Sequence, residues 1–202
     1  MVHSRNLRLL TWMKGAALAF WLAGIAAGVL ITAQYQNSVG APGSAPPLWP
    51  SGSSLRPRAG QFTAVMAVHP HCTCTRAGLE ELARLMAQGR DRLEVVVLFI
   101  RPREVGGRWD KSDLWDMAGR IPDVTVRSDP GGTEARRFGA RTSDHLVLYD
   151  RRGRLSFSGG ITSSRGHSGD NRGRSAILSI LGGKKGREQF FIFGCSLFGE
   201  ET

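Results

Sequence analysis

The apolar positions of the chain fall into one long run near the N-terminus and a series of shorter segments beyond residue 60. The run from Gly15 to Ala33 carries no charged residue. A helix of that length, rising about 1.5 Å per residue, nearly crosses a hydrocarbon layer of about 30 Å. The lysines and arginines before the run are Arg5, Arg8 and Lys14, and the next along the chain is Arg56. This asymmetry predicts a signal anchor whose N-terminus is cytoplasmic.

The segments on either side of this run complete the predicted N-terminal organisation. We expect a cytoplasmic N-terminus at residues 1–14, a transmembrane signal anchor at 15–34 and a linker at 35–60, where proline, glycine and serine dominate without periodicity. A cleaved signal peptide is the alternative, although the apolar run is longer than the usual core of such peptides. Both interpretations place the rest of the chain in the periplasm or on another extracytoplasmic side, where disulfides persist.

Beyond the linker, the apolar spacing predicts strands that alternate with helices. Continuous apolar stretches at 62–68 and 93–100 are typical of buried strands. Between them, apolar residues recur at spacings of three and four, which predicts an amphipathic helix from Thr75 or Arg76 to Gln88. Weaker patterns predict helices at 110–119 and 132–138, strands at 124–126, 146–149 and 155–158, and a last helix from Asp170 or Asn171 to Leu181. These elements form one predicted domain at 61–183, followed by a C-terminal tail at 184–202.

Composition limits the function classes open to this domain. The chain has 202 residues, which suffices for one domain of about 150 residues with appendages. Its 27 Lys and Arg outnumber its 17 Asp and Glu, but the basic residues are scattered and lack the interleaved aromatic residues of a nucleic-acid surface. We therefore expect no nucleic-acid partner. Three cysteines are too few for a disulfide-stapled mini-fold or a four-cysteine zinc site.

The candidate chemistry lies where the first strand of the predicted domain ends and its first helix begins. Cys72 and Cys74 are placed there, preceded by His69 and His71. The positive end of a helix dipole stabilises a thiolate, which is the reactive form of cysteine. Either histidine is a candidate for stabilising that thiolate or relaying a proton, since an unperturbed imidazole titrates near physiological pH.

The order of elements, with two cysteines directly after the first strand, resembles the thioredoxin-like superfamily over about residues 60–183. Residues 129–155, where a helix ending in Phe-Gly leads to a strand, an Asp-x-x-Gly turn and a second strand, are similar to a segment of membrane-anchored thiol–disulfide oxidoreductases and peroxiredoxin-related proteins. The resemblance implies an α/β fold, a thioredoxin-like three-layer α/β/α sandwich with a mixed sheet. The chain departs from the thioredoxin pattern twice. Its motif is Cys-x-Cys rather than Cys-x-x-Cys, and Ser143 or Asp144 stands where thioredoxins carry a cis-proline.

The resemblance also assigns roles to the two cysteines of the motif. Cys72 is expected to attack the disulfide of a partner protein, and Cys74 to resolve the mixed disulfide that forms. The reverse assignment stays open, because the motif is one residue shorter than in thioredoxins. The expected partners are a protein thiol or disulfide and, through the N-terminal helix, the membrane. No cofactor is expected.

A Gly/Ser-rich stretch at 159–171 is the second candidate part of the site. In a thioredoxin-like topology it lies at the sheet end that carries the cysteines. Arg165 and His167 are therefore expected near Cys72, where a cation lowers a thiol pKa. A flexible polar loop that ends at a helix N-cap is the alternative interpretation of this stretch.

Two other functions and one further thiol stay open. His71, Cys72 and Cys74 form an alternative donor set for a copper-binding or copper-delivery module, because thiolates and imidazole suit Cu(I). A thiol peroxidase is a further alternative, although the Pro-x-x-x-Thr-x-x-Cys pattern of peroxiredoxins is absent. Cys195 lies in an apolar stretch of the tail. It is predicted either as a third redox thiol that reaches the motif or as a small residue buried where the tail packs on the sheet.

Overall fold

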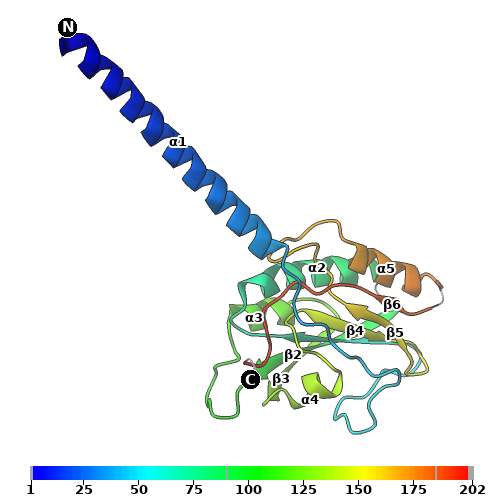
Figure 1. Cartoon of the computed structure of the whole chain (residues 1–202). Helices are drawn as coiled ribbons and strands as arrows, with labels where there is room; N and C mark the ends of the chain where they lie inside the picture. The colour runs from blue at the N-terminus through cyan, green and yellow to red at the C-terminus, as the bar shows by residue number, and fades with distance from the viewer. Residues whose placement is uncertain (1, 90, 185, 200–202) are drawn as a thin grey trace. The chain divides into compact units, whose positions relative to one another are not determined.

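The N-terminal part of the structure is a single long helix. The computed structural model describes residues 2–89, 91–184 and 186–199, and it divides the chain into two units, Met1–Asn37 and Ser38–Thr202. The first unit consists of α1 (Val2–Gln36), drawn in blue in Figure 1. Within α1, the segment Trp12–Gln36 is long and apolar enough to cross a membrane, judged by length and composition. This segment contains the predicted anchor at 15–34.

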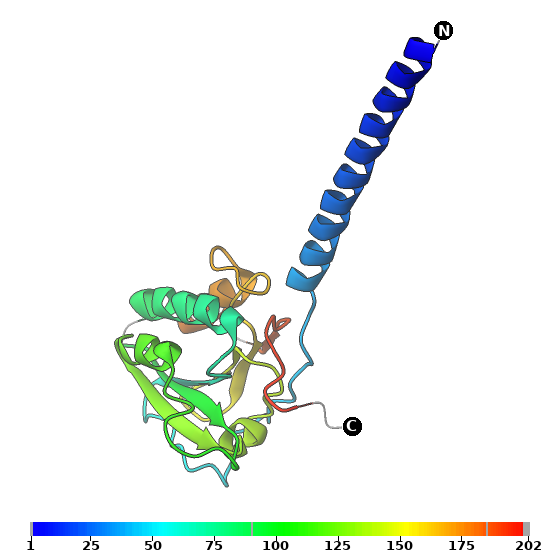
Figure 2. The same ribbon diagram turned by 90° about the vertical axis from the view of Figure 1, so that its left-hand side faces the viewer.

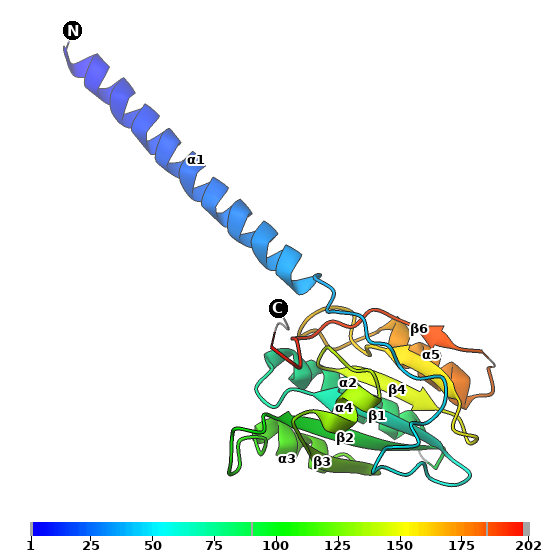
Figure 3. The ribbon, with the colours of Figure 1, turned by 60° about the horizontal axis from the view of Figure 1, so that its bottom comes forward.

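The second unit is built around a six-stranded mixed sheet. Its strands are β1 (Phe62–Val68), β2 (Leu93–Arg101), β3 (Val124–Pro130), β4 (His145–Tyr149), β5 (Leu155–Gly159) and β6 (Glu188–Gln189). They lie side by side in the order β3-β2-β1-β4-β5-β6 (Figure 3). The strands β1, β2 and β3 run parallel, β4 is antiparallel to β1 and β5, and β6 is parallel to β5. The end of β1 therefore lies beside the start of β4, where Ala67 pairs with His145.

Helices cover the two faces of the sheet unequally, as Figure 2 shows. The helices α2 (Thr73–Gly89), α3 (Asp113–Gly119) and α5 (Arg172–Leu181) share one apolar core with the sheet, and α4 (Thr133–Arg137) packs on the opposite face. Alternation along β1 divides its side chains between the two faces, because successive residues of a strand point to opposite sides. Met66 enters the core under α2, and Val65 enters the core on the other face.

The segment predicted as a linker at 35–60 differs from expectation, because from Ser38 onward it belongs to the second unit. Its residues Ala45 and Leu55 are buried in the core on the α4 face. Backbone hydrogen bonds tie the segment down, including one of 2.8 Å from the Trp49 amide to the Gly153 carbonyl. The physical reason is that α4, with five residues, leaves apolar strand surface that this segment covers.

Most other elements agree with the predicted ones to within a few residues, and three differ. First, α2 begins at Thr73, so that Cys74 lies in its first turn. Second, β3 continues to Pro130 because it stays paired with β2 as far as Arg101. Third, the tail predicted at 184–202 contributes the short strand β6.

Candidate functional site

Cys72 and Cys74 lie at the junction of β1 and α2. Cys72 directly precedes the helix, and its carbonyl accepts a hydrogen bond of 3.1 Å from the Thr75 amide. Both cysteines are buried, with 3% of Cys72 and 4% of Cys74 exposed. This placement agrees with the position expected from the sequence. Cys72 therefore lies at the N-terminal end of α2, and Cys74 lies within its first turn.

The third cysteine of the chain meets the other two. The Sγ atom of Cys195 lies 2.8 Å from the Sγ atom of Cys72, and all three sulfur atoms lie within 4.8 Å of one another. Cys195 is half-buried and is the most exposed of the three. Both interpretations left open for Cys195 meet features of the structure: its sulfur reaches the motif, and the tail beside it packs on the sheet through Leu197. Spacing along the chain could not predict this contact, since 123 residues separate the two cysteines.

Burial and the neighbouring thiols make ionisation of Cys74 and Cys195 unfavourable. Burial, followed by the effect of Cys72, raises the pKa of the Cys74 thiol. Burial also raises the pKa of Cys195, to about 12, and the neighbouring Cys72 and Cys74 add to the rise. Three sulfur atoms this close disfavour more than one thiolate at a time, because like charges repel in a buried site.

Arg165, which the sequence predicted near Cys72, exerts an electrostatic effect on the other two thiols. Its charge acts to lower the pKa of both Cys74 and Cys195, although burial outweighs it. Its Nε atom donates to the carbonyl and the hydroxyl of Ser38, at 3.0 and 2.9 Å. His167 lies on the exposed side of the same loop, where its Nδ1 atom is 2.9 Å from the Arg165 carbonyl oxygen.

The rings of His69 and His71, the two histidines before the motif, both contact the ring of Trp109. Trp109 meets the ring of His69 edge-on with centroids 5.6 Å apart, and the ring of His71 at 4.6 Å. The Nε2 atom of His71 also lies 3.0 Å from the Trp109 carbonyl oxygen. Burial, followed by the charge of His71, lowers the pKa of His69, which is therefore neutral at pH 7. Among the residues that the structure describes, the clustered metal-ligating side chains are the three cysteines and do not include His71.

Asp144 is a buried acid beside the site, and the sequence assigned it no catalytic role. It directly precedes β4 with a φ of 71°, a conformation that residues other than glycine seldom adopt. Burial raises the pKa of its carboxyl to about 7, while the hydroxyls of Thr75 and Ser143 limit the rise. These two hydroxyls bond each other at 2.9 Å, and within the described part of the chain neither carboxyl oxygen of Asp144 forms a hydrogen bond of ordinary geometry. The charge of Asp144 in turn raises the pKa of Cys74.

The available signal for Asp144 was its place in the sequence. Either Ser143 or Asp144 stands where the thioredoxin pattern has a proline. At this departure from the pattern, the structure has a buried carboxyl without a hydrogen-bond partner among the described residues. Its packing could not be predicted, because it depends on Gly78 of α2. A Cβ atom at that position would lie 2.8 Å from the carboxyl carbon of Asp144.

A buried glutamate fixes the end of the Gly/Ser-rich stretch at 159–171. The carboxylate of Glu81, on α2, is fully buried and accepts hydrogen bonds from the Gly169 amide at 2.7 Å and from Asn171 Nδ2 at 2.9 Å. Its ion pair with Arg174, at 2.8 Å, links α2 to α5. Asn171 also caps α5, as predicted, because its side chain accepts from the Arg174 amide at 2.7 Å.

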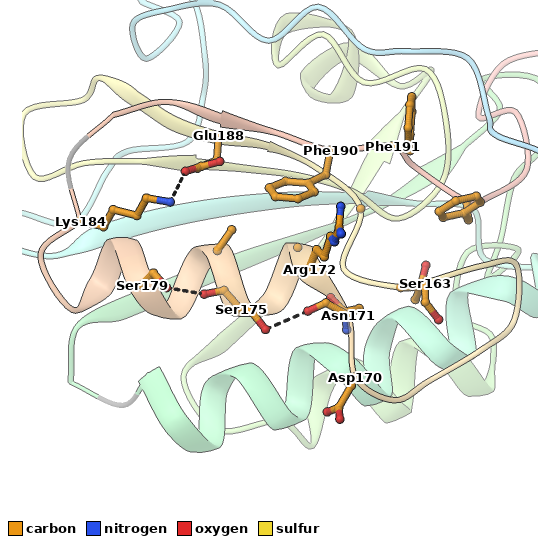
Figure 4. Close-up of a pocket in the computed structure, with 15 residues that line it drawn as sticks. Ser163, Asp170, Asn171, Arg172, Ser175, Ser179, Lys184, Glu188, Phe190 and Phe191 are labelled. Atoms are coloured by element: carbon orange, nitrogen blue, oxygen red, sulfur yellow. Dashed lines mark hydrogen bonds and ion pairs between the residues drawn. The ribbon is translucent and has the colours of Figure 1, made fainter.

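A large open cavity lies away from the cysteines. Figure 4 shows that α5 and the chain around Phe190 and Phe191 form its walls, with Asn171 and Arg172 at the start of the helix. Its volume is roughly 800 Å³, and its lining includes none of the three cysteines. The three thiols at the end of β1 therefore lie outside this cavity.

Comparison with solved structures finds similar folds. An uncharacterised conserved protein from Geobacillus kaustophilus is similar with a TM-score of 0.58 and 17% identity, over 82% of this chain and 94% of that one. A hypothetical protein from Sinorhizobium meliloti has a TM-score of 0.54 and 20% identity, over 79% and 93%. A secreted disulfide oxidoreductase from Mycobacterium tuberculosis has a TM-score of 0.43 and 12% identity, over 62% and 84%. Comparison with protein-family models and with curated sequences finds no match.

The class of the fold is thioredoxin-like. The parallel strands β1 to β3, the antiparallel pair β4 and β5, and helices on both faces form the sandwich that the sequence resemblance implied. Within this fold, the chain carries a group of three thiols. A Cys-x-Cys motif follows β1, and a cysteine from the C-terminal tail completes a group of three sulfur atoms.

Proposed function

We propose that the protein is a thiol–disulfide oxidoreductase whose Cys72 exchanges with the disulfide or thiols of a partner protein. The observation that carries this proposal is the contact of 2.8 Å between the sulfur atoms of Cys72 and Cys195 at the start of α2. A helix N-terminus favours the thiolate that attacks, and an adjacent thiol supplies the group that completes the exchange.

The reaction on a partner disulfide has two steps. The Cys72 thiolate attacks one sulfur of the partner and forms a mixed disulfide, and the partner's other sulfur leaves as a thiolate that takes up a proton. A second thiol of the cluster then attacks Cys72 and releases the partner's remaining sulfur. The sequence assigned this second step to Cys74. The reverse order oxidises a dithiol partner with the same balance of atoms and electrons.

Asp144 supports the second step as a proton acceptor. Its carboxyl has a pKa of about 7, so it exchanges a proton near neutral pH, whereas an ordinary aspartate is already ionised there. The charge of Asp144 raises the pKa of Cys74, which supports the proximity of the two side chains. When Cys74 is the second thiol, the proton that it loses is taken up by this carboxyl.

The proposed location is extracytoplasmic, with α1 as a membrane anchor. The apolar length of Trp12–Gln36 supports a span, and the basic residues before it support a cytoplasmic N-terminus. This location also suits the chemistry, because disulfides persist outside the cytoplasm.

The proposal is tested with the full chain in detergent, using exchange between reduced glutathione and a fluorescent peptide disulfide. We expect the protein to accelerate this exchange and Cys72→Ala to lower the accelerated rate at least tenfold. Thr73→Ala, at the exposed neighbouring position, serves as the control and keeps the rate. A Cys72→Ala variant that is as fast as the unmodified chain would contradict the proposal.

Binding of a soft metal ion is a second candidate function, favoured by the grouping of three sulfur atoms within 4.8 Å. Three thiolates suit Cu(I). An anaerobic titration of the full chain with Cu(I) is expected to give one ion per chain, with at least tenfold weaker binding in Cys195→Ser and unchanged binding in His71→Ala. Binding that needs His71 and survives the loss of Cys195 would instead support the donor set expected from the sequence.

A further inference from the structure

The C-terminal tail passes the cysteine motif as a paired segment. The Ser143 amide donates to the Cys195 carbonyl at 2.8 Å, and the Leu197 amide donates to the Arg141 carbonyl at 2.9 Å. Between these bonds, Thr142 and Ser196 form an antiparallel bridge. Two backbone bonds on either side of a bridge fix the register of the tail against the chain that leads into β4. Cys195 is therefore held at a defined place.

Buried side chains anchor the tail on both sides of Cys195. Ile192 precedes it and Leu197 follows it, and both are buried. Leu197 belongs to the apolar cluster on the α4 face of the sheet, where Ala67 and Ile100 also lie. The ring of Phe198 lies 3.6 Å from the guanidinium carbon of Arg136. Cys195 thus lies between anchors that form part of the core.

Close approach of the tail depends on a glycine next to Cys195. A Cβ atom at position 194 would lie 2.1 Å from the carbonyl oxygen of Ser143, which is far inside van der Waals contact. A glycine at this position allows the two backbones to meet closely. Gly199, four residues beyond Cys195, has no such neighbour, because a Cβ atom there would meet nothing within 4 Å.

These contacts bear on which thiol pairs with Cys72. Residues two apart in a chain have Cα atoms near the edge of the range that a disulfide accepts, so a bridge within the motif is constrained by the backbone. The sulfur of Cys195 already contacts that of Cys72, at 2.8 Å, from a separate and anchored segment. We propose that Cys195, rather than Cys74, is the thiol with which Cys72 forms the disulfide of the oxidised protein. This inference rests on the proposed function and names its resolving thiol.

The chemistry balances with three thiols, of which two are consumed. After Cys72 has formed the mixed disulfide with the partner, the Cys195 thiolate attacks the Cys72 sulfur and the partner's sulfur leaves. The proton lost by Cys195 is the one that the departing thiolate takes up. The protein thereby loses two electrons to the partner, and Cys74 remains a thiol throughout. The mixed disulfide also removes the ionisable Cys72 thiol, which had helped to raise the pKa of Cys195.

The test is a map of the disulfide in the full chain. The reduced protein is oxidised in detergent with oxidised glutathione, acid-quenched, alkylated and digested with trypsin. Cleavage after Arg58, Arg76 and Arg187 puts Cys72 and Cys74 in the peptide 59–76 and Cys195 in the peptide 188–202. We expect these two peptides to be joined, with one alkylated cysteine in the first. Cys74→Ser should keep the link and Cys195→Ser should lose it.

An internal bridge in peptide 59–76, with Cys195 alkylated, would overturn the inference. The proposed function would survive that result if Cys72→Ala still abolished exchange, and it would fail with the inference if Cys72→Ala kept full exchange. The two failures are therefore distinguishable by comparing the peptide map with the exchange rate.

A second pair of variants keeps all three thiols. Gly194→Ala pushes the tail away from Ser143, and Gly199→Ala is the matched control in open space. We expect the yield of joined peptides to fall at least fivefold in Gly194→Ala and to stay unchanged in Gly199→Ala, with both variants folded by circular dichroism. A folded Gly194→Ala variant that forms the link at the unmodified yield would contradict the role given to the tail.

Discussion

The two faces of the sheet are covered in different ways, and the site lies where the two coverings meet. On one face, α2, α3 and α5 pack through periodic apolar residues. On the other, the five-residue α4 is joined by the segment after Ser38 and by the tail around Leu197. The helical face supplies Cys72 and Cys74, and the irregular face supplies Cys195. The Cys-x-Cys motif therefore adjoins a helix with periodic apolar residues, whereas the third thiol lies in a tail that has no such periodicity.

The largest expected effect on stability comes from breaking the ion pair between Glu81 and Arg174, which links α2 to α5. Glu81→Ala removes a fully buried carboxylate and leaves Arg174, with 11% of its side chain exposed, without this partner. Breaking a buried ion pair from one side costs about 3–5 kcal/mol. We expect urea unfolding of the full chain in detergent to show a loss of that size, and Glu80→Ala on the same helix to change stability by less than ~1 kcal/mol. Equal losses in both variants would contradict the role of the Glu81 network.

Substitutions within residues 38–60 test whether this segment packs on the α4 face of the sheet, because an unpacked linker would tolerate them. Leu55 is 3% exposed and Leu48 is 60% exposed, although both belong to the segment predicted as a linker. Truncation of a buried leucine costs about 2–5 kcal/mol, while surface changes stay within about 0.5 kcal/mol. We expect Leu55→Ala to lower the free energy of unfolding by about 2–4 kcal/mol and Leu48→Ala to leave it nearly unchanged. Equal and small effects would restore the linker interpretation.

The buried carboxyl of Asp144 leads to a prediction of how the stability of the protein depends on pH. The raised pKa of Asp144 means that the folded chain keeps a proton that the unfolded chain loses above about pH 4. This residue therefore lowers stability as pH rises toward about 7. We expect Asp144→Asn to remove that loss. Its stability relative to the unmodified chain should increase from pH 4 to pH 7, measured as the difference in Tm. A difference that stays constant, or that falls, would show that the carboxyl is ionised in the folded chain.

The smallest expected effect concerns the cation beside the thiols. Arg165 acts to lower the pKa of Cys74 and Cys195, so Arg165→Gln should raise both values. A higher pKa lowers the thiolate fraction, and the thiolate is the form that is alkylated. We expect alkylation of these two thiols at pH 8 to slow, with no change for Arg120→Gln at an exposed position. Faster alkylation of Arg165→Gln would indicate that the arginine shields the thiols instead of activating them.

The contrast between the faces also explains how much could be predicted from the sequence. The spacing of Leu79, Leu82 and Leu85 is enough to predict α2, and continuous apolar runs are enough to predict β1 and β2. The packing of residues 38–60 depends on which strand surface α4 leaves uncovered, and no local pattern carries that information. The contact between Cys195 and Cys72, 123 positions apart, depends likewise on the pairing of the tail with residues 141–143. The burial of Asp144 could not be predicted either, because it follows from tertiary contacts with α2.

The most direct test of the exchange chemistry uses a full chain that keeps Cys72 alone. In the double variant Cys74→Ser/Cys195→Ser, Cys72 attacks oxidised glutathione and no second thiol resolves the product. We expect a stable glutathione adduct on Cys72, located by mass spectrometry, that forms faster than on the same chain unfolded in urea. The unmodified chain should instead pass to an internal disulfide without accumulating the adduct. An adduct that forms no faster in the folded variant than in urea would contradict an attacking role for Cys72.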